Sequence, residues 1–235
     1  MTPRILIYGG TFCDTEENRE MVKLWSKVVR GINRDCDVLV IDSCSPFDPR
    51  VFLAGEVEVV GFETNVGHLC RGGQDGAGRT LTEGMLIAAE RGYDYCVHWE
   101  TDLLFARPIR PIVEKMARTG VKVAALPQKY YQFLEWGISF YNVRHMIESR
   151  FVERYCWQTA PTWPIPEIRI EQLVQDDLFL LPYRGMRNDM NEANVENLAG
   201  LFPYMPPDYI TRATLPLCHE FLRLNGLQVN DARAA

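Results

Sequence analysis

The 235-residue sequence lacks a Cys-x-x-Cys pair, a G-x-G-x-x-G motif, a long apolar run and an excess of basic residues. Its seven scattered cysteines predict neither a zinc site nor a disulfide framework. No stretch approaches the roughly 18 apolar residues of a membrane-spanning helix, and the N-terminus has no signal-peptide core. We therefore expect a cytoplasmic protein without a transmembrane segment.

The charge balance is acidic, with a formal net charge of -6. A nucleic-acid binder needs clustered lysine and arginine to displace counterions from phosphates, so no nucleic-acid partner is expected. Gly9-Gly10 begins no dinucleotide-binding motif, which disfavours a dehydrogenase. The 47% hydrophobic and 24% charged composition is typical of a soluble enzyme, and the length suits one large α/β domain.

The first 105 residues alternate strand and helix patterns. Short apolar runs at 4–10, 37–43 and 57–63 predict buried strands. A helix capped by Asp14 or Thr15 is predicted between the first two, because apolar residues recur there at helical spacing. This stripe consists of Met21, Leu24, Trp25, Val28, Val29 and Ile32. A strand–helix–strand unit of this length predicts a parallel sheet.

Further along, Thr80 to Glu83 forms a capping box that predicts a helix through about Arg91. The pattern at 109–116 predicts another helix, and those at 121–126 and 138–143 predict strands. From about residue 150 onward, prolines interrupt the pattern repeatedly. This indicates an irregular, substrate-facing C-terminal region.

Two carboxylates, Glu100 and Asp102, follow a short apolar-rich run. If they continue the strand, both project to one side while Thr101 points away. Ligands of α/β enzymes bind at such strand ends, and paired carboxylates suit a hard divalent cation that also binds substrate phosphates. The segment therefore suggests a metal-bridged nucleotide or nucleotide-sugar.

The order of these elements resembles the glycosyltransferases of the GT-A fold over roughly residues 4–180. The resemblance lies in Asn65-Val66-Gly67, Gly78-Arg79-Thr80 and the DXD-like Glu100-Thr101-Asp102. Glu100 stands where the family usually has Asp, and Gly78-Arg79-Thr80 replaces a frequent Ala-Arg-Asn. The resemblance implies one Rossmann-like α/β domain with a mostly parallel central sheet flanked by helices. Residues 1–105 would form the nucleotide-binding half and residues 106–235 the acceptor half.

The implied activity is transfer of a sugar, with inversion, from a nucleoside diphosphate donor to a carbohydrate or other hydroxyl acceptor. Mn or Mg would be held by Asp102, by Glu100 and by a late histidine, His219. Asp177, or its neighbour Asp176, resembles the late acidic motif that supplies the general base of inverting members. The nucleotide would meet Asp42, Ser43, Asn65, Arg79, Glu100 and Thr101. Aromatic platforms for the acceptor are expected first at Trp136, then at Tyr131, Trp157 and Trp163.

Each of these residues also has an ordinary structural role: acids solvate or cap turns, a lone histidine forms hydrogen bonds, and aromatic rings usually fill the core. A P-loop phosphotransferase is a second interpretation, because residues 73–80 nearly match G-x-x-x-x-G-K-[ST], with Arg79 in place of the lysine. A non-catalytic protein of the same fold that binds nucleotide-sugars or carbohydrates is a third.

Overall fold

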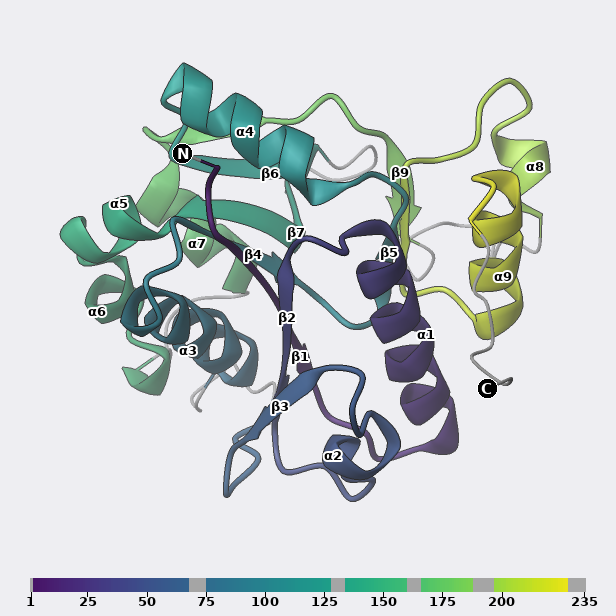
Figure 1. Ribbon diagram of the computed structural model, residues 1–235, viewed down its shortest axis with the longest axis horizontal. Helices are drawn as coiled ribbons and strands as arrows, with labels where there is room; N and C mark the ends of the chain where they lie inside the picture. Colours follow the sequence, from purple (N-terminus) through teal and green to yellow (C-terminus); the bar gives the residue numbers. More distant parts are fainter. Residues whose placement is uncertain (1, 68–74, 128–133, 160–165, 188–196, 228–235) are drawn as a thin grey trace.

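A computed structural model describes residues 2–67, 75–127, 134–159, 166–187 and 197–227. Within these ranges a seven-stranded sheet has the order β3-β2-β1-β4-β7-β6-β8 (Figure 1). Its strands are β1 (Ile5–Thr11), β2 (Asp37–Asp42), β3 (Glu58–Gly61), β4 (Tyr95–Trp99), β6 (Val123–Pro127), β7 (Leu134–Asn142) and β8 (Leu178–Leu180). All neighbours pair in parallel except β7, which runs antiparallel to both β4 and β6. The predicted mostly parallel α/β sheet is therefore confirmed.

Helices cover both faces of this sheet. The described helices are α1 (Glu16–Ile32), α2 (Pro49–Phe52), α3 (Gly76–Glu90), α4 (Ile109–Thr119), α5 (Val143–Glu148), α6 (Phe151–Tyr155), α7 (Pro166–Val174), α8 (Leu198–Leu201) and α9 (Leu215–Leu224). Side chains of α1 and α4 form one buried cluster with the sheet, and those of α3, α5, α6 and α7 form another on the opposite face. Among the described residues, no helix is long and apolar enough to cross a bilayer.

The apolar stripe of α1 faces two ways. Trp25 and Val29 pack against the central sheet, whereas Met21, Leu24 and Val28 belong to a third buried cluster. That cluster is completed by α8, α9 and a second sheet of β5 (Leu103–Phe105), β10 (Tyr209–Thr211) and β9 (Gly185–Arg187), in the order β5-β10-β9. Figure 1 shows α1 between the central strands and α9. The C-terminal region therefore packs beside the N-terminal half.

The N-terminus of α1 follows the prediction, because the Thr15 side chain accepts a hydrogen bond from the Asn18 N–H. The predicted start of α3 is wrong. Its first turn begins at Gly76, and Asp75 caps it by accepting from the Gly78 N–H at 2.9 Å. Because Asp75 caps the helix further upstream, the capping box at Thr80 does not mark its start, and Thr80 lies within the helix.

The earlier start presses α3 against the end of β1. Thr80 is buried, and a β-carbon on Gly10 would lie only 2.6 Å from its Cγ2 methyl. Glycine at this position therefore lets the helix approach the strand end closely. The contact matters because Gly10 and Thr80 both line a polar cavity.

We predict that Gly10→Ala lowers the free energy of unfolding by about 2 kcal/mol, because the new methyl overlaps Thr80. In a Thr80→Ala background the same change should cost about half as much, since the colliding methyl and hydroxyl are gone. Urea unfolding of the four proteins measures both costs. Gly31→Ala is the control, because a β-carbon there meets open space. Equal costs in the two backgrounds would contradict the contact.

Candidate functional site

A cavity of about 440 Å³ lies at the carboxyl ends of β1, β2 and β4. Its described lining residues come from residues 10–102, with Arg212 as the exception. The chain continues from β1 to β2 on one side and returns to β4 on the other, and open α/β sheets bind ligands at such switch points. The volume is in the range of small-molecule sites.

The predicted acidic pair lines this cavity, but it does so from a turn and not from a strand. β4 ends at Trp99, and the Leu103 N–H donates to the Glu100 carbonyl at 3.1 Å. Glu100, Thr101 and Asp102 all line the cavity. The two acids therefore lie at the end of β4, as expected, but the alternation of side chains along a strand does not place them there. The turn is held between two strands. The Glu100 N–H donates to the Gly137 carbonyl at 2.7 Å, and the Thr101 hydroxyl donates to the Gly10 carbonyl at 2.9 Å.

The two acids of the turn sit in different environments. The pKa of Glu100 is raised to about 8, mainly by desolvation and then by the negative charge of Asp102, while Arg212 acts in the opposite direction. Asp102 is partly exposed, and its Oδ2 lies 3.0 Å from Nε of Arg212. Asp102 is therefore the more accessible of the two carboxyl groups.

A third carboxyl, Glu135, lies behind Glu100. A β-carbon on Gly137 would come within 2.8 Å of Glu135 Oε1 and 3.0 Å of Glu100 Oε2. Glycine at this position therefore leaves room for both carboxyl groups to lie next to it. Glu135 is buried, its Oε2 has no hydrogen-bond partner among the described residues, and burial raises its pKa to about 7. The sequence analysis missed Glu135. An acid directly before Trp136 gives no local signal that it will be buried.

The donor set fits a hard divalent cation that a substrate helps to hold. Such ions commonly take one or two protein carboxylates and complete their coordination with water and substrate phosphates, and Glu100 and Asp102 offer that pair. Over the described ranges there is no group of three or more His, Cys, Asp or Glu side chains that could hold a metal ion. The predicted trio of Glu100, Asp102 and His219 is therefore not assembled.

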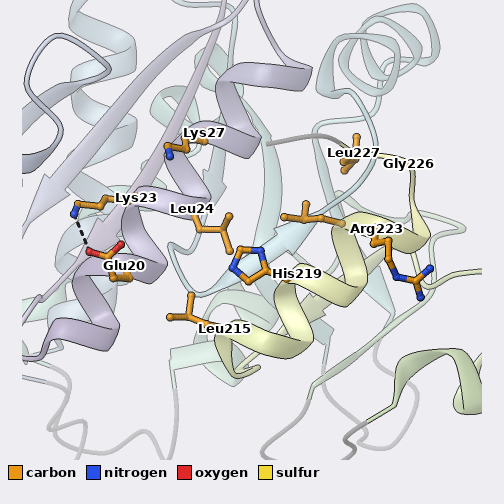
Figure 2. Close-up of a pocket in the computed structure, with 10 residues that line it drawn as sticks. Glu20, Lys23, Leu24, Lys27, Leu215, His219, Arg223, Gly226 and Leu227 are labelled. Atoms are coloured by element: carbon orange, nitrogen blue, oxygen red, sulfur yellow. Dashed lines mark hydrogen bonds and ion pairs between the residues drawn. The ribbon is translucent and has the colours of Figure 1, made fainter. Parts of the chain in front are cut away.

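His219 lies on α9 and lines a different cavity, of about 710 Å³, between α1 and α9. Figure 2 shows it beside Leu24 and Leu215, in the same view as the ion pair of Lys23 with Glu20. The expectation that this late histidine joins Asp102 is corrected. The residue of the C-terminal region that contacts Asp102 is instead Arg212, which directly follows β10.

The expected nucleotide contacts divide into two groups. Ser43 and Asn65 line the cavity together with Gly10 and Thr11. Asp42 is buried and turned to its own loop, where its carboxylate accepts hydrogen bonds from the Ser45 N–H and hydroxyl. Asp42 thus caps a turn, one of the two roles that its sequence allowed.

Arg79 does not stand free at a helix N-terminus as expected, because α3 begins three residues before it. Its guanidinium lies 3.6 Å from the centre of the Phe62 ring, and its Nη1 donates to the Thr64 carbonyl at 2.9 Å. These contacts fasten the loop after β3 to α3. The phosphate-binding role predicted for Arg79 is therefore not supported by its position.

Asp176 and Asp177 lie at the opposite edge of the sheet. They immediately precede β8, whose Leu178 pairs with Val123 at the start of β6. The carboxylate of Asp177 lies 2.9 Å from Nε2 of His145, which follows β7 at the same edge. A general base must reach the acceptor hydroxyl, so the assignment of Asp177 or Asp176 to that role was wrong. The expectation of inversion loses its basis with it.

Of the four aromatic residues predicted to form acceptor platforms, the two that the structure describes do not line the cavity. Trp136 is buried in the core of the α3 face, and its indole N–H has no partner among the described residues. Trp157 packs near α3, with the Arg79 guanidinium 5.2 Å from its ring centre. Tyr131 and Trp163 lie outside the described residues.

No protein-family model and no curated protein matches this sequence. Solved structures do match its fold. An active-site mutant of LgtC matches with a TM-score of 0.57 at 13% identity, over 95% of each chain. A glycosyltransferase involved in glycosylation of the major capsid of PBCV-1 matches with a TM-score of 0.54 at 11% identity, over 96% of this chain and 100% of that chain.

The glycosyltransferase GlyE of Streptococcus pneumoniae TIGR4 matches with a TM-score of 0.56 at 10% identity. The match covers 97% of this chain but only 62% of GlyE, so this chain spans less than two thirds of that protein's length. Likeness at such low identity is a likeness of fold. Together with the sheet order and the cavity at its switch point, it shows that this chain has the GT-A fold.

Proposed function

We propose that this protein is a glycosyltransferase that moves a sugar from a nucleoside diphosphate donor to a hydroxyl group of a carbohydrate or other acceptor. The observation that carries the proposal is the turn of Glu100, Thr101 and Asp102, which lines the cavity at the carboxyl ends of β1 and β4. The fold that this chain shares with glycosyltransferases supports the same activity. The P-loop alternative loses support, because Gly76 to Thr80 already belong to α3.

The cavity lining suggests how the donor lies. Gly10, Thr11, Ser43 and Asn65 gather on the β1–β2 side and offer small and polar contacts for a nucleoside, whereas Glu100 and Asp102 lie in the turn that follows β4. We assign the diphosphate to the acidic side, where Asp102 would hold Mn²⁺ or Mg²⁺ directly and Glu100 would join once it is ionised. When bound, such a cation offsets the negative charge that develops on the leaving diphosphate.

The residues of the acidic turn are fixed before any donor arrives. Main-chain and hydroxyl hydrogen bonds tie the turn to Gly137 and Gly10, so the main chain that carries the two acids needs little reordering on binding. We propose transfer without a stereochemical outcome, because the base on which inversion rested lies at the other edge of the sheet. We further propose that residues up to about 105 hold the nucleotide and that the later residues hold the acceptor.

We predict that Asp102→Asn weakens Mn²⁺-dependent binding of nucleoside diphosphates at least tenfold, roughly the effect of losing one charged ligand, and abolishes transfer. Thermal shift and calorimetry with a panel of nucleoside diphosphates, followed by donor hydrolysis assays, measure these effects. Asp177→Asn is the matched control and should keep both binding and transfer, since Asp177 pairs with His145 far from the cavity.

Turnover by Asp102→Asn at the rate of the parent protein would contradict the assignment of the metal-binding carboxylate. Tight binding of a nucleotide-sugar by the parent, without hydrolysis or transfer to any acceptor offered, would instead favour the non-catalytic binding protein of the same fold.

A further prediction concerns the pH dependence of stability. The raised pKa of Glu100, about 8, means that the folded protein keeps this proton while the unfolded chain loses it near the ordinary value of 4.5. The contribution of Glu100 to stability is therefore full below about pH 4.5 and is lost as the pH rises through about 8. In a solution containing EDTA, Glu100→Gln should gain roughly 2 kcal/mol relative to the parent between pH 5 and pH 8.5.

Urea unfolding at several pH values measures this gain. Glu58→Gln is the control, because Arg91 lowers the pKa of Glu58 and its effect should stay constant over the same range. A pH-independent difference between Glu100→Gln and the parent would show that Glu100 is ionised in the empty cavity.

A further inference from the structure

Arg212 is joined to the acidic turn by its main chain and by its side chain. β10 pairs antiparallel with β5 so that Thr211 lies opposite Leu103, which places the next residue, Arg212, beside Asp102. The Arg212 N–H donates to the Asp102 carbonyl at 3.3 Å, and the guanidinium Nε lies 3.0 Å from Asp102 Oδ2. Two segments about a hundred residues apart in sequence thus meet at one carboxylate.

The charges of the cavity make this contact important. The described lining contains three carboxyl groups, those of Asp14, Glu100 and Asp102. Arg212 is the only lysine or arginine among the described residues that line it. His98 also lines the cavity, but its side chain is buried and its Nδ1 lies 3.4 Å from the Trp136 carbonyl oxygen. A diphosphate entering this space would therefore meet carboxylates and one guanidinium.

The ion pair between Arg212 and Asp102 can separate at little cost in free energy. The Arg212 side chain is 45% exposed and the Asp102 side chain 35%, and an ion pair in contact with water contributes little net stability. Arg212 also has a φ of 55°, in the left-handed region, which a non-glycine residue adopts at some cost and often at functional positions. The main chain is held by the register with β5, and the guanidinium is in contact with solvent.

We propose that Arg212 is an exchangeable counter-ion of this cavity. In the empty protein its guanidinium neutralises Asp102. When a nucleoside diphosphate binds, the guanidinium leaves Asp102 and pairs with the diphosphate oxygens, whose geometry it matches through two parallel N–H donors. The freed Asp102 carboxylate is then available to a divalent cation. This inference rests on the proposed nucleotide-sugar function and assigns to it a residue that acts on both the cation and the diphosphate.

The exchange has two consequences of opposite sign. Because Arg212 competes for Asp102, it lowers the affinity of the empty protein for a divalent cation alone. Because it contacts the diphosphate, it raises the affinity for the nucleotide. A residue that only supports the fold would shift both affinities in the same direction or neither of them.

The test is calorimetry on the full chain with two probes, MnCl₂ alone and a panel of UDP, GDP, ADP, CDP and dTDP in saturating Mn²⁺. Arg212→Met should bind Mn²⁺ about fivefold more tightly and the preferred diphosphate about tenfold more weakly than the parent. Arg107→Met is the matched control. Arg107 is 40% exposed, lies in the same region and pairs with Asp208 at 2.6 Å, so its loss should leave both affinities unchanged.

Arg212→Lys covers the case in which the methionine variant fails to fold. It keeps the charge that competes for Asp102 and loses the planar pair of donors, so Mn²⁺ affinity should stay near that of the parent while diphosphate affinity falls about threefold. Unchanged affinities in both Arg212 variants, or equal weakening of both probes in Arg212→Met, would overturn the inference alone. A parent protein that binds neither Mn²⁺ nor any diphosphate of the panel would overturn the proposed function and the inference together.

Discussion

Two hydrogen bonds hold the turn of Glu100, Thr101 and Asp102 between β1 and β7, and they determine which side chains line the cavity. The Glu100 N–H reaches across to Gly137, and the Thr101 hydroxyl reaches back to Gly10. These two bonds hold the acids at the switch point of the sheet, where a ligand can enter but where their charges are costly to desolvate. Glycine at both acceptor positions is required by close packing: a β-carbon would collide with Thr80 at one and approach two carboxyls at the other.

The antiparallel strand β7 and the second sheet make this position chemically asymmetric. β7 brings Glu135 behind Glu100, so that a buried acidic cluster favours the proton on Glu100. β10 brings Arg212 to Asp102 from the other side, so that this carboxylate pairs with a guanidinium. Two carboxyl groups only two residues apart in sequence thus differ in their surroundings, and they can respond to different parts of one ligand. α1 makes this possible because it packs against the central sheet with one side and against the second sheet with the other.

Local patterns predicted much of this. The apolar run of β1, the Thr15 cap and the stripe of α1 are signals that neighbouring residues carry together, and the structure follows them. The position of Glu100 and Asp102 could also be predicted, because strand ends in such folds meet at one edge. Arg212, Glu135 and Asp177 could not be placed, since their positions depend on strand order and register. An arginine after Tyr209–Thr211 is unremarkable until β10 pairs with β5, and Asp177 is a plausible base until β8 is found parallel to β6 with its start at the far edge.

The central claim is that the cavity between β1 and β4 receives a cation and a diphosphate through Asp102. A crystal structure of the protein with Mn²⁺ and its preferred nucleoside diphosphate, with anomalous diffraction recorded for manganese, tests it most directly. The account predicts an anomalous peak at the carboxylate of Asp102, next to the diphosphate, with the nucleoside against Ser43 and Asn65. A nucleotide bound in the cavity between α1 and α9, or a manganese peak remote from Asp102, would contradict it.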